Sequence, residues 1–381
     1  MKNQSTALLR ALTATCLAAC SAQSQPPPPP PAPAPSAPLS APISVASAPA
    51  PITDRPAPLL RPAGFTARRS LALNVPGSFG VAADDRHAYG VAYEGQGGAF
   101  RVARQGGAVE VLAGAQEWSR DIAVDATTLY WVRGHGATPG GSVSAMAKQG
   151  GPVREIAPHQ ADAHLITVDA THVYWANGGG YDGDGGTGKA EIRRMAKQGG
   201  PVETIAAISG VVSLRLAEDT LYVLAVAGPG ADASIVAKMP KSGGAVSVLA
   251  PSGPGPVDLD LDDTHLYWTL RGELEMPPPI QCKSATPCPV ATTAPIVRHG
   301  ELRRVPRAGG AAEVLARDLV HAGSLVLGTQ SILLSAGGEL FELPKAGGPK
   351  VSRGPGVSSR FAISQGEVFA VSGGQLFAFG P

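Results

Sequence analysis

A ten-residue pattern recurs along this chain and restricts the possible folds more than any other feature. It reads "IAVDATTLYW" at residues 122–131, "ITVDATHVYW" at 166–175 and "LDLDDTHLYW" at 259–268, with a degenerate copy, "LRLAEDTLYVL", at 214–224. Each copy has two apolar segments on either side of a polar turn, which is typical of two adjacent β-strands. Repeats spaced by about 40 to 45 residues indicate that one supersecondary unit is copied along the chain.

Gly–Gly pairs mark a second turn in each repeat. A segment ending in Lys or Arg precedes each pair, and a strand such as "VREIA" follows it. Tight turns between twisted strands need positive φ, which glycine adopts without strain. Each repeat therefore contains four strands, as a propeller blade does. The pairs occupy residues 106–107, 150–151, 199–200, 243–244, 309–310 and 347–348.

Seven copies of the second strand can be counted, and they predict an all-β fold, a seven-bladed β-propeller with four antiparallel strands per blade, over residues 64–381. The last copy stops after three strands, so we expect the segment "ARRSLALN" at 67–74 to supply the fourth. Such an N-terminal strand would close the ring and protect its edges. The equivalent second-strand residues are Tyr89, Tyr130, Tyr174, Tyr222, Tyr267, Leu333 and Phe369.

The N-terminus has the order of a secretory signal. Lys2 and Arg10 flank a polar start, and the short apolar run "ALTATCLAA" follows. The sequence Leu17-Ala18-Ala19-Cys20 resembles the lipobox of bacterial lipoproteins. This resemblance implies a signal peptide at residues 1–19, a lipidated Cys20 and export to the cell envelope, with Ser21 favouring the outer membrane. The alternative is an ordinary signal peptide with an incidental cysteine.

Residues 20–63 are expected to form a disordered linker. The stretch from Pro26 to Pro62 is mostly Pro, Ala and Ser. Such a composition favours polyproline II, at about 3.1 Å per residue, and gives a semi-rigid spacer of roughly 100 Å at most. The alternative is a ligand for a proline-binding domain, and a spacer between a lipid anchor and a folded head needs no further partner.

The repeats also resemble a known family. "VDATHVYW" followed by "MAKQGGPVETIA" is similar to YWTD-type propellers and their bacterial lipoprotein relatives, over residues 77–353. The resemblance implies the propeller fold and says little about function, because propellers serve many functions. Two differences are visible: Leu270 follows Thr269 where the family has aspartate, and seven blades are counted where six are usual.

One face of the predicted ring collects charged turn residues. It holds the turns between first and second strands and between third and fourth strands, and we call it the turn face. A basic ring that docks on an anionic surface is one interpretation. The favoured one is that each aspartate caps its own turn and pairs with a neighbouring cation. The residues are Asp125, Asp169, Asp262, Asp263, Arg104, Lys148, Lys197, Lys241, Arg307 and Lys345.

The opposite face, which we call the loop face, carries the second-to-third-strand loops and the connections between blades. Its loops at 133–141, 177–189, 227–233 and 271–299 are long and variable, and such loops on a rigid scaffold often carry function. Trp131, Trp175 and Trp268 are expected to pack within blades, whereas Trp118 could be an exposed stacking platform. The candidate binding residues are Trp118, His135, His159, His164, Tyr181, Asp182, Asp184, Glu273, Glu275, His299 and His321.

Two motifs within these loops have a structural and a functional interpretation. In "YDGDGGTG", Asp182 and Asp184 could hold calcium, but the spacing lacks a later bidentate glutamate, so a hairpin loop is favoured. Cys282 and Cys288 remain once the signal is removed and Cys20 is lipidated, and an oxidising compartment favours a disulfide between them. Zinc would need two further ligands, and only His299 is near in sequence.

Composition limits the functional classes. With 31 Lys plus Arg against 30 Asp plus Glu, no global field points to nucleic acid, and contact with a membrane is expected through the lipid anchor alone. The sequence favours a monomeric binding or scaffold module for an envelope protein or glycan, with no cofactor or metal. Streptogramin lyases are also seven-bladed propellers, so a lyase-like enzyme with a histidine and metal site on the loop face is the alternative.

Overall fold

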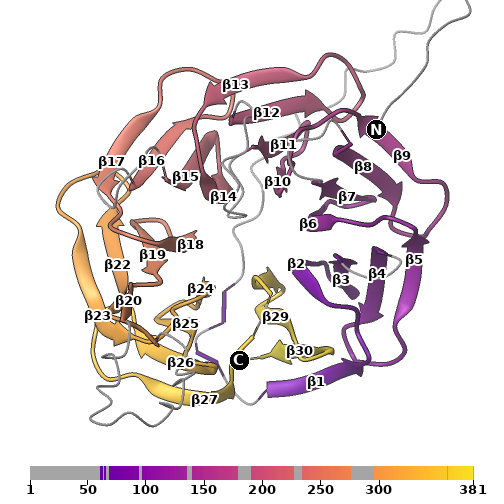
Figure 1. Cartoon of the computed structure of the whole chain (residues 1–381). Helices are drawn as coiled ribbons and strands as arrows, with labels where there is room; N and C mark the ends of the chain where they lie inside the picture. The colour runs from indigo at the N-terminus through magenta and orange to yellow at the C-terminus, as the bar shows by residue number, and fades with distance from the viewer. Residues whose placement is uncertain are drawn as a thin grey trace, which may run out of the picture. The chain divides into compact units, whose positions relative to one another are not determined.

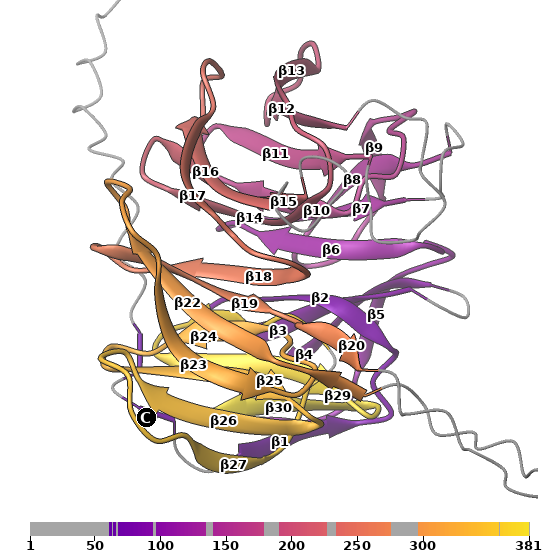
Figure 2. The same cartoon turned by 60° about the vertical axis from the view of Figure 1, so that its left-hand side comes forward.

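Seven four-stranded antiparallel sheets are arranged around a central axis (Figure 1). The computed structural model describes residues 61–62, 64–65, 68–93, 97–134, 140–178, 190–226, 234–275, 296–357 and 359–380. No helix in these ranges is long and apolar enough to cross a membrane. The seven-bladed, all-β prediction is confirmed. Successive sheets pack face to face, as Figure 2 shows from the side.

The first four blades follow one another along the chain, each running from the axis outward. The first blade consists of β2 (Ser78–Ala83), β3 (His87–Ala92), β4 (Gly98–Ala103) and β5 (Glu110–Gly114), and the second of β6 (Ser119–Val124), β7 (Thr128–Arg133), β8 (Ser142–Ala147) and β9 (Arg154–Ala157). The third consists of β10 (Leu165–Val168), β11 (His172–Asn177), β12 (Glu191–Ala196) and β13 (Glu203–Ala207), and the fourth of β14 (Val211–Ala217), β15 (Thr220–Val226), β16 (Ser234–Pro240) and β17 (Ser247–Pro251).

The fifth blade carries an additional hairpin, β20 (Glu273–Glu275) with β21 (Ile296–Arg298), which begins and ends the longest loop. This blade consists of β18 (Pro256–Leu261), β19 (His265–Leu270), β22 (Gly300–Pro306) and β23 (Glu313–Leu319), and the sixth of β24 (Leu325–Leu327), β25 (Ser331–Ala336), β26 (Glu339–Pro344) and β27 (Val351–Pro355). The seventh consists of β28 (Ala362–Ser364), β29 (Glu367–Ser372), β30 (Gln375–Phe379) and β1 (Arg68–Leu73).

Large side chains of the second strands fill the space between blades. Trp131, Trp175 and Trp268 are fully buried, as expected for blade packing. The second-strand residue counted in each repeat is also buried, with Tyr130 the most exposed of the seven at 5%. The repeat therefore exists because each blade hides its apolar face only against its neighbours.

The N-terminal strand closes the ring, as the sequence predicts. β1 pairs antiparallel with β30, and Arg68 lies opposite Phe379. Leu71 and Ala72 are buried in a cluster with residues of the first and seventh blades. The Arg68 guanidinium also covers the ring of Phe377, at 3.2 Å from its centroid. The chain thus pairs the outer edge that the C-terminal repeat leaves open.

Arg61, the first residue that the structure describes, already contacts the propeller, although the expected domain start is residue 64. The Arg61 guanidinium donates to both carboxylate oxygens of Asp260, at 2.9 and 3.1 Å, and to the carbonyls of Leu261 and Leu327. The Thr329 amide donates to the Pro62 carbonyl at 2.6 Å. Phe65 is 2% exposed and packs between the sixth and seventh blades. These contacts fix the last residues of the linker at the turn face.

Candidate functional site

Aspartates cap the first turns of four blades, which the sequence predicted for Asp125, Asp169 and Asp262 but not for Asp84. In the second blade, one oxygen of Asp125 accepts from the amides of Thr127 and Thr128, at 2.9 and 2.8 Å. Its other oxygen accepts from the Tyr130 hydroxyl at 3.1 Å. The same arrangement recurs at Asp84, Asp169 and Asp262. The Asp and Tyr of the repeat motif are therefore one hydrogen-bonded unit.

The cation that completes each unit comes from the following blade. The Lys197 ammonium of the third blade donates to Asp125 of the second at 2.6 Å, and its side chain is 12% exposed. Because these side chains are largely buried, such pairs join neighbouring blades more firmly than exposed surface pairs would. Equivalent inter-blade pairs are Lys148 with Asp84, Lys241 with Asp169 and Lys345 with Asp262.

Two arginines make the corresponding contacts where the motif is degenerate. Arg104 of the first blade pairs with Glu367 of the seventh, so it joins the two ends of the repeat array. Arg307 of the fifth blade donates to the Tyr222 hydroxyl of the fourth at 2.8 Å. All six Gly–Gly-turn cations are thus engaged between blades. This geometry supports the structural interpretation of the turn face over a free basic ring.

The inter-blade pairs have a consequence for acid stability. Burial alone would raise the pKa of Asp84, but donors from Lys148, from the Arg86 and His87 amides and from Tyr89 outweigh it and lower the pKa from 3.8 to about 2. Comparable donors outweigh burial and lower the pKa values of Asp125, Asp169 and Asp262. The folded state therefore binds these protons more weakly than the unfolded chain does.

We expect the free energy of unfolding to fall as the pH is lowered from about 4 to about 2, because stabilisation from a lowered aspartate pKa is complete only above the unfolded value. Lys148→Met should weaken this dependence, since Asp84 loses its charged donor. Urea unfolding of both proteins between pH 2 and pH 6, with the exposed-site variant Arg86→Ala as control, measures it. Equal slopes for Lys148→Met and the unmodified protein would contradict this account.

Carboxylates also lie along the central axis, where the innermost strand of each blade leaves one edge without a partner strand. Asp121 of β6 accepts from the amide of Ile122 and from the amide of Ile166 in the next blade, both at 3.0 Å. Asp260 of β18 accepts likewise from Leu327, at 2.9 Å. These side chains satisfy backbone donors that would otherwise lack a partner near the axis.

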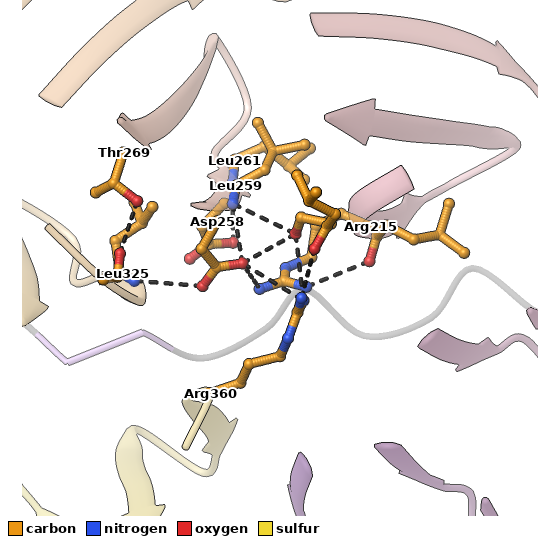
Figure 3. A network of polar contacts seen from close by, with 12 residues as sticks. Arg215, Asp258, Leu259, Leu261, Thr269, Leu325 and Arg360 are labelled. Atoms are coloured by element: carbon orange, nitrogen blue, oxygen red, sulfur yellow. Dashed lines mark hydrogen bonds and ion pairs between the residues drawn. The ribbon is translucent and has the colours of Figure 1, made fainter. Parts of the chain in front are cut away.

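Asp258 is the centre of this axial network (Figure 3). Its side chain is 1% exposed and accepts from the Ser213 hydroxyl at 2.9 Å and from the amides of Leu259 and Leu325. Arg215 lies 3.1 Å from the carboxylate, and Arg360 lies 3.6 Å from it. Arg360 belongs to the seventh blade, so its side chain extends across the axis to the fourth and fifth.

The axial charges compensate one another. Burial raises the pKa of Asp121, although Arg360 and the surrounding donors oppose the increase. Burial would also raise the pKa of Asp260, but Arg61 and Arg215 outweigh it and lower that pKa. The sequence analysis missed this network. The signal was present in "VDLDL" at 257–261, which places two acids in one first strand, whereas the first strands of the other repeats have one acid at most.

The four predicted histidines that the structure describes do not converge on one centre. Both ring nitrogens of His164 lie beside backbone carbonyls, those of Asp162 at 3.0 Å and Val211 at 2.7 Å, so this residue joins the third and fourth blades. His159 and His321 are exposed and have positive φ. His299 lies 3.1 Å from Asp318, and their side chains are 66% and 79% exposed.

Other predicted residues lie outside what the structure describes. Within the described ranges, no three His, Cys, Asp or Glu side chains are grouped to hold a metal ion. The backbone of Glu273 and Glu275 forms β20, and their side chains are not among those described. The residues outside the described ranges are Cys20, His135, Tyr181, Asp182, Asp184, Cys282 and Cys288.

A small pocket opens at the base of the longest loop, on the loop face of the fifth blade. It has a volume of about 340 Å³ and is lined by Pro254, Leu270, Gly272, His299, Glu301 and Arg303. Glu301 is 9% exposed and pairs with Arg303 at 2.5 Å and with Arg317 at 2.6 Å. The pocket therefore combines an apolar wall with a carboxylate that is already neutralised.

Trp118 lies on the loop face between the first and second blades and is 38% exposed, whereas the other three tryptophans are fully buried. Its ring meets that of Tyr93 edge to face, with centroids 5.1 Å apart. The Arg120 guanidinium lies 5.8 Å from the Tyr93 ring centroid and pairs with Asp162 at 3.2 Å. This placement agrees with an exposed aromatic platform.

Comparisons with known proteins support the fold. No protein-family model and no curated protein sequence is similar to this chain at a significant level. Among solved structures, it is similar to the tricorn protease, with a TM-score of 0.52 and 12% identity over 82% of this chain and 34% of the other. It is also similar to the N-terminal domain of Nup159, with a TM-score of 0.50 and 10% identity over 85% of this chain and 97% of the other.

A gluconolactonase from Xanthomonas campestris has a TM-score of 0.49 and 14% identity, over 85% of this chain and 97% of the other. The chain spans about a third of the tricorn protease chain. Identities this low show the fold alone. The protein is thus a seven-bladed β-propeller whose blades are joined by ion pairs on the turn face and along the axis.

Proposed function

We propose that this protein is a lipoprotein of the bacterial cell envelope, anchored through Cys20 to the outer membrane, and that it binds a protein or glycan partner through its loop face. The lipobox-like "LAAC" and the Pro-rich segment support the anchor and the spacer. The repeats support a relationship to YWTD-type lipoprotein propellers. In this proposal the propeller acts as a binding module rather than an enzyme.

One observation supports the choice of face most directly. The six Gly–Gly-turn cations of the turn face are engaged between blades, whereas the loop face presents the exposed Trp118 and the pocket beside His299. A surface whose charged groups already hold the blades together offers few groups to a partner. A lyase-like activity would need a histidine and carboxylates converging at one centre, and the exposed His299–Asp318 pair has neither burial nor a third member among the described residues.

The choice of face can be tested by shortening the longest loop. We expect that replacing residues 276–295 with a short Gly-containing turn between β20 and β21 will abolish capture of a partner from envelope extract and leave the melting temperature nearly unchanged. The fold should survive because β19 and β22 pair directly beneath the hairpin, and loop length affects stability only weakly.

Arg86→Ala is the matched control for this experiment, because Arg86 is 81% exposed on the turn face. It should capture the partner as well as the unmodified protein does. Loss of capture in Arg86→Ala, with capture retained by the shortened loop, would place the binding surface on the turn face instead.

The anchor has a separate test. We expect Cys20→Ala to prevent acylation and to move the protein from the membrane fraction to the soluble envelope fraction, because alanine lacks the thiol that would carry an acyl chain. Fractionation with immunoblotting, alongside Cys16→Ala as control, measures the change. A Cys20→Ala protein that still sediments with membranes would disprove the proposed anchor.

A further inference from the structure

Trp118 occupies a turn position that has an equivalent in four other blades. In five blades, an amide at the end of the second strand or one residue beyond it donates to the carbonyl of a residue one to three positions before the first strand. In the second blade this bond runs from Gly134 to Trp118, at 3.1 Å. In the first, third, fourth and fifth blades the carbonyl that accepts this bond belongs to Gly77, Asp162, Gly210 and Gly255.

The backbone at this position is left-handed in four of the five blades. Gly210 and Gly255 have φ values of 57° and 61°, and Asp162 has 49°. These are the residue types that adopt positive φ most readily. Trp118 has a φ of 64°. A bulky side chain is strained in this conformation, so Trp118 departs from the residue preference seen at the equivalent positions.

Burial does not fully compensate for this cost. Trp118 keeps 38% of its surface exposed, although it contacts the edge or face of Tyr93. Residues that break a local rule without full structural compensation are concentrated at functional sites. Polar groups lie next to Trp118: the preceding residue, Glu117, is exposed, and the Arg133 guanidinium donates to the Glu117 carbonyl at 3.2 Å.

We infer that Trp118 is a stacking platform for a saccharide ring, with Tyr93 supporting it and Arg133 and Glu117 at its polar rim. The inference rests on the proposed use of the loop face and specifies the partner as a glycan. A pyranose ring presents an apolar C–H surface of about the size of one indole and hydroxyl groups around it. This combination matches one aromatic ring set among hydrogen-bonding groups.

A protein partner would require a wider apolar surface, because a stable interface buries about 800 Å² on each side and has an apolar centre. The described residues of the loop face do not provide one. The other exposed large apolar side chains are Val320, in a connection on this face, and residues in or beside the outermost strands, namely Leu73, Val111, Val153, Val202, Val248 and Val351. Trp118 therefore stands without a surrounding apolar patch in the described part of the chain.

The chain offers a direct spectroscopic test. Trp118 is the one exposed residue among four tryptophans, all of which lie in the described ranges, so quenching by acrylamide reports on it almost alone. We expect at least one of three probes, chitotriose, cellotriose or maltotriose, to shift the emission to shorter wavelength and to reduce the quenching. Trp118→Gly should weaken binding of that probe by about tenfold or more, measured by calorimetry.

Stability provides the second readout. Glycine relieves the left-handed strain, so Trp118→Gly should melt no lower than the unmodified protein. Ala115→Gly is the matched control, because Ala115 is exposed three residues earlier with a φ of 54°, and this variant should keep full saccharide binding. No spectral response to any of the three probes would overturn the inference. A clear loss of stability in Trp118→Gly would also overturn it, because the ring would then be retained for packing.

These outcomes can be separated from failure of the proposed function. If the shortened loop loses partner capture but no saccharide protects Trp118, the loop face is correct and the glycan assignment is wrong. If Arg86→Ala loses capture while the shortened loop retains it, the loop-face proposal itself is wrong. A saccharide response that disappears in Trp118→Gly and persists in Ala115→Gly supports the glycan assignment.

Discussion

Removing residues 64 to 75 should largely unfold the propeller under conditions in which the full chain is stable. The deletion removes β1, and with it the buried side chains of Phe65, Leu71 and Val75. Each fully buried large apolar side chain contributes about 1.5–3 kcal/mol, so the total is comparable with the whole stability of a typical domain. The deletion also leaves β30 as an unpaired edge, which promotes aggregation.

The control for this deletion is a shortened linker. Removing residues 26 to 45 takes away a longer stretch of chain, which lies outside the described structure, and it should leave the melting temperature unchanged. Thermal unfolding followed by far-ultraviolet circular dichroism, with light scattering to detect aggregation, compares the two. Equal melting temperatures for both truncations would show that β1 does not close the ring in solution.

The second large effect is expected at Asp258. Replacing it with alanine should cost about 3–5 kcal/mol, because it leaves Arg215 and Arg360 without their buried counter-ion and removes the acceptor for two backbone amides. Asp258→Asn should cost less than Asp258→Ala, since the amide oxygen can still accept a hydrogen bond. Urea unfolding at neutral pH measures both variants.

Asp85→Ala provides the matched control, because Asp85 is a turn-face aspartate whose side chain is 64% exposed. Its effect should lie within about 0.5 kcal/mol of zero. If Asp258→Ala unfolds at the same urea concentration as Asp85→Ala, the axial network does not stabilise the ring.

The inter-blade ion pairs could be predicted from the sequence only in part. The aspartates of the first turns and the cations of the Gly–Gly turns could be assigned to one face of the ring from their places in the repeat. That they pair with each other could be expected, but not which cation pairs with which aspartate. The structure shows that Lys197 reaches back to Asp125 rather than to the turn of its own blade, because face-to-face packing brings the outer turn of one blade beside the first turn of the preceding one.

The number of blades, their strand order and the closing role of residues 67–74 follow from the sequence alone. The reason is that each repeat carries a local signal, alternating apolar residues and Gly–Gly turns, and the same packing problem is solved seven times. The burial of Trp131, Trp175 and Trp268 follows in the same way. The exposure of Trp118 could be suspected because it lies in a connection outside the repeated strands.

The axial network and the anchoring of Arg61 were decided by the tertiary structure. Asp258 and Arg360 are about a hundred residues apart in the chain, and they meet because the ring brings the inner ends of the fifth and seventh blades, which the sixth blade separates, to the same axis. Arg61 reaches Asp260 for the same reason. Local patterns specify strands and turns, whereas contacts across the axis depend on the curvature accumulated over all seven blades, and no short segment of the sequence encodes that curvature.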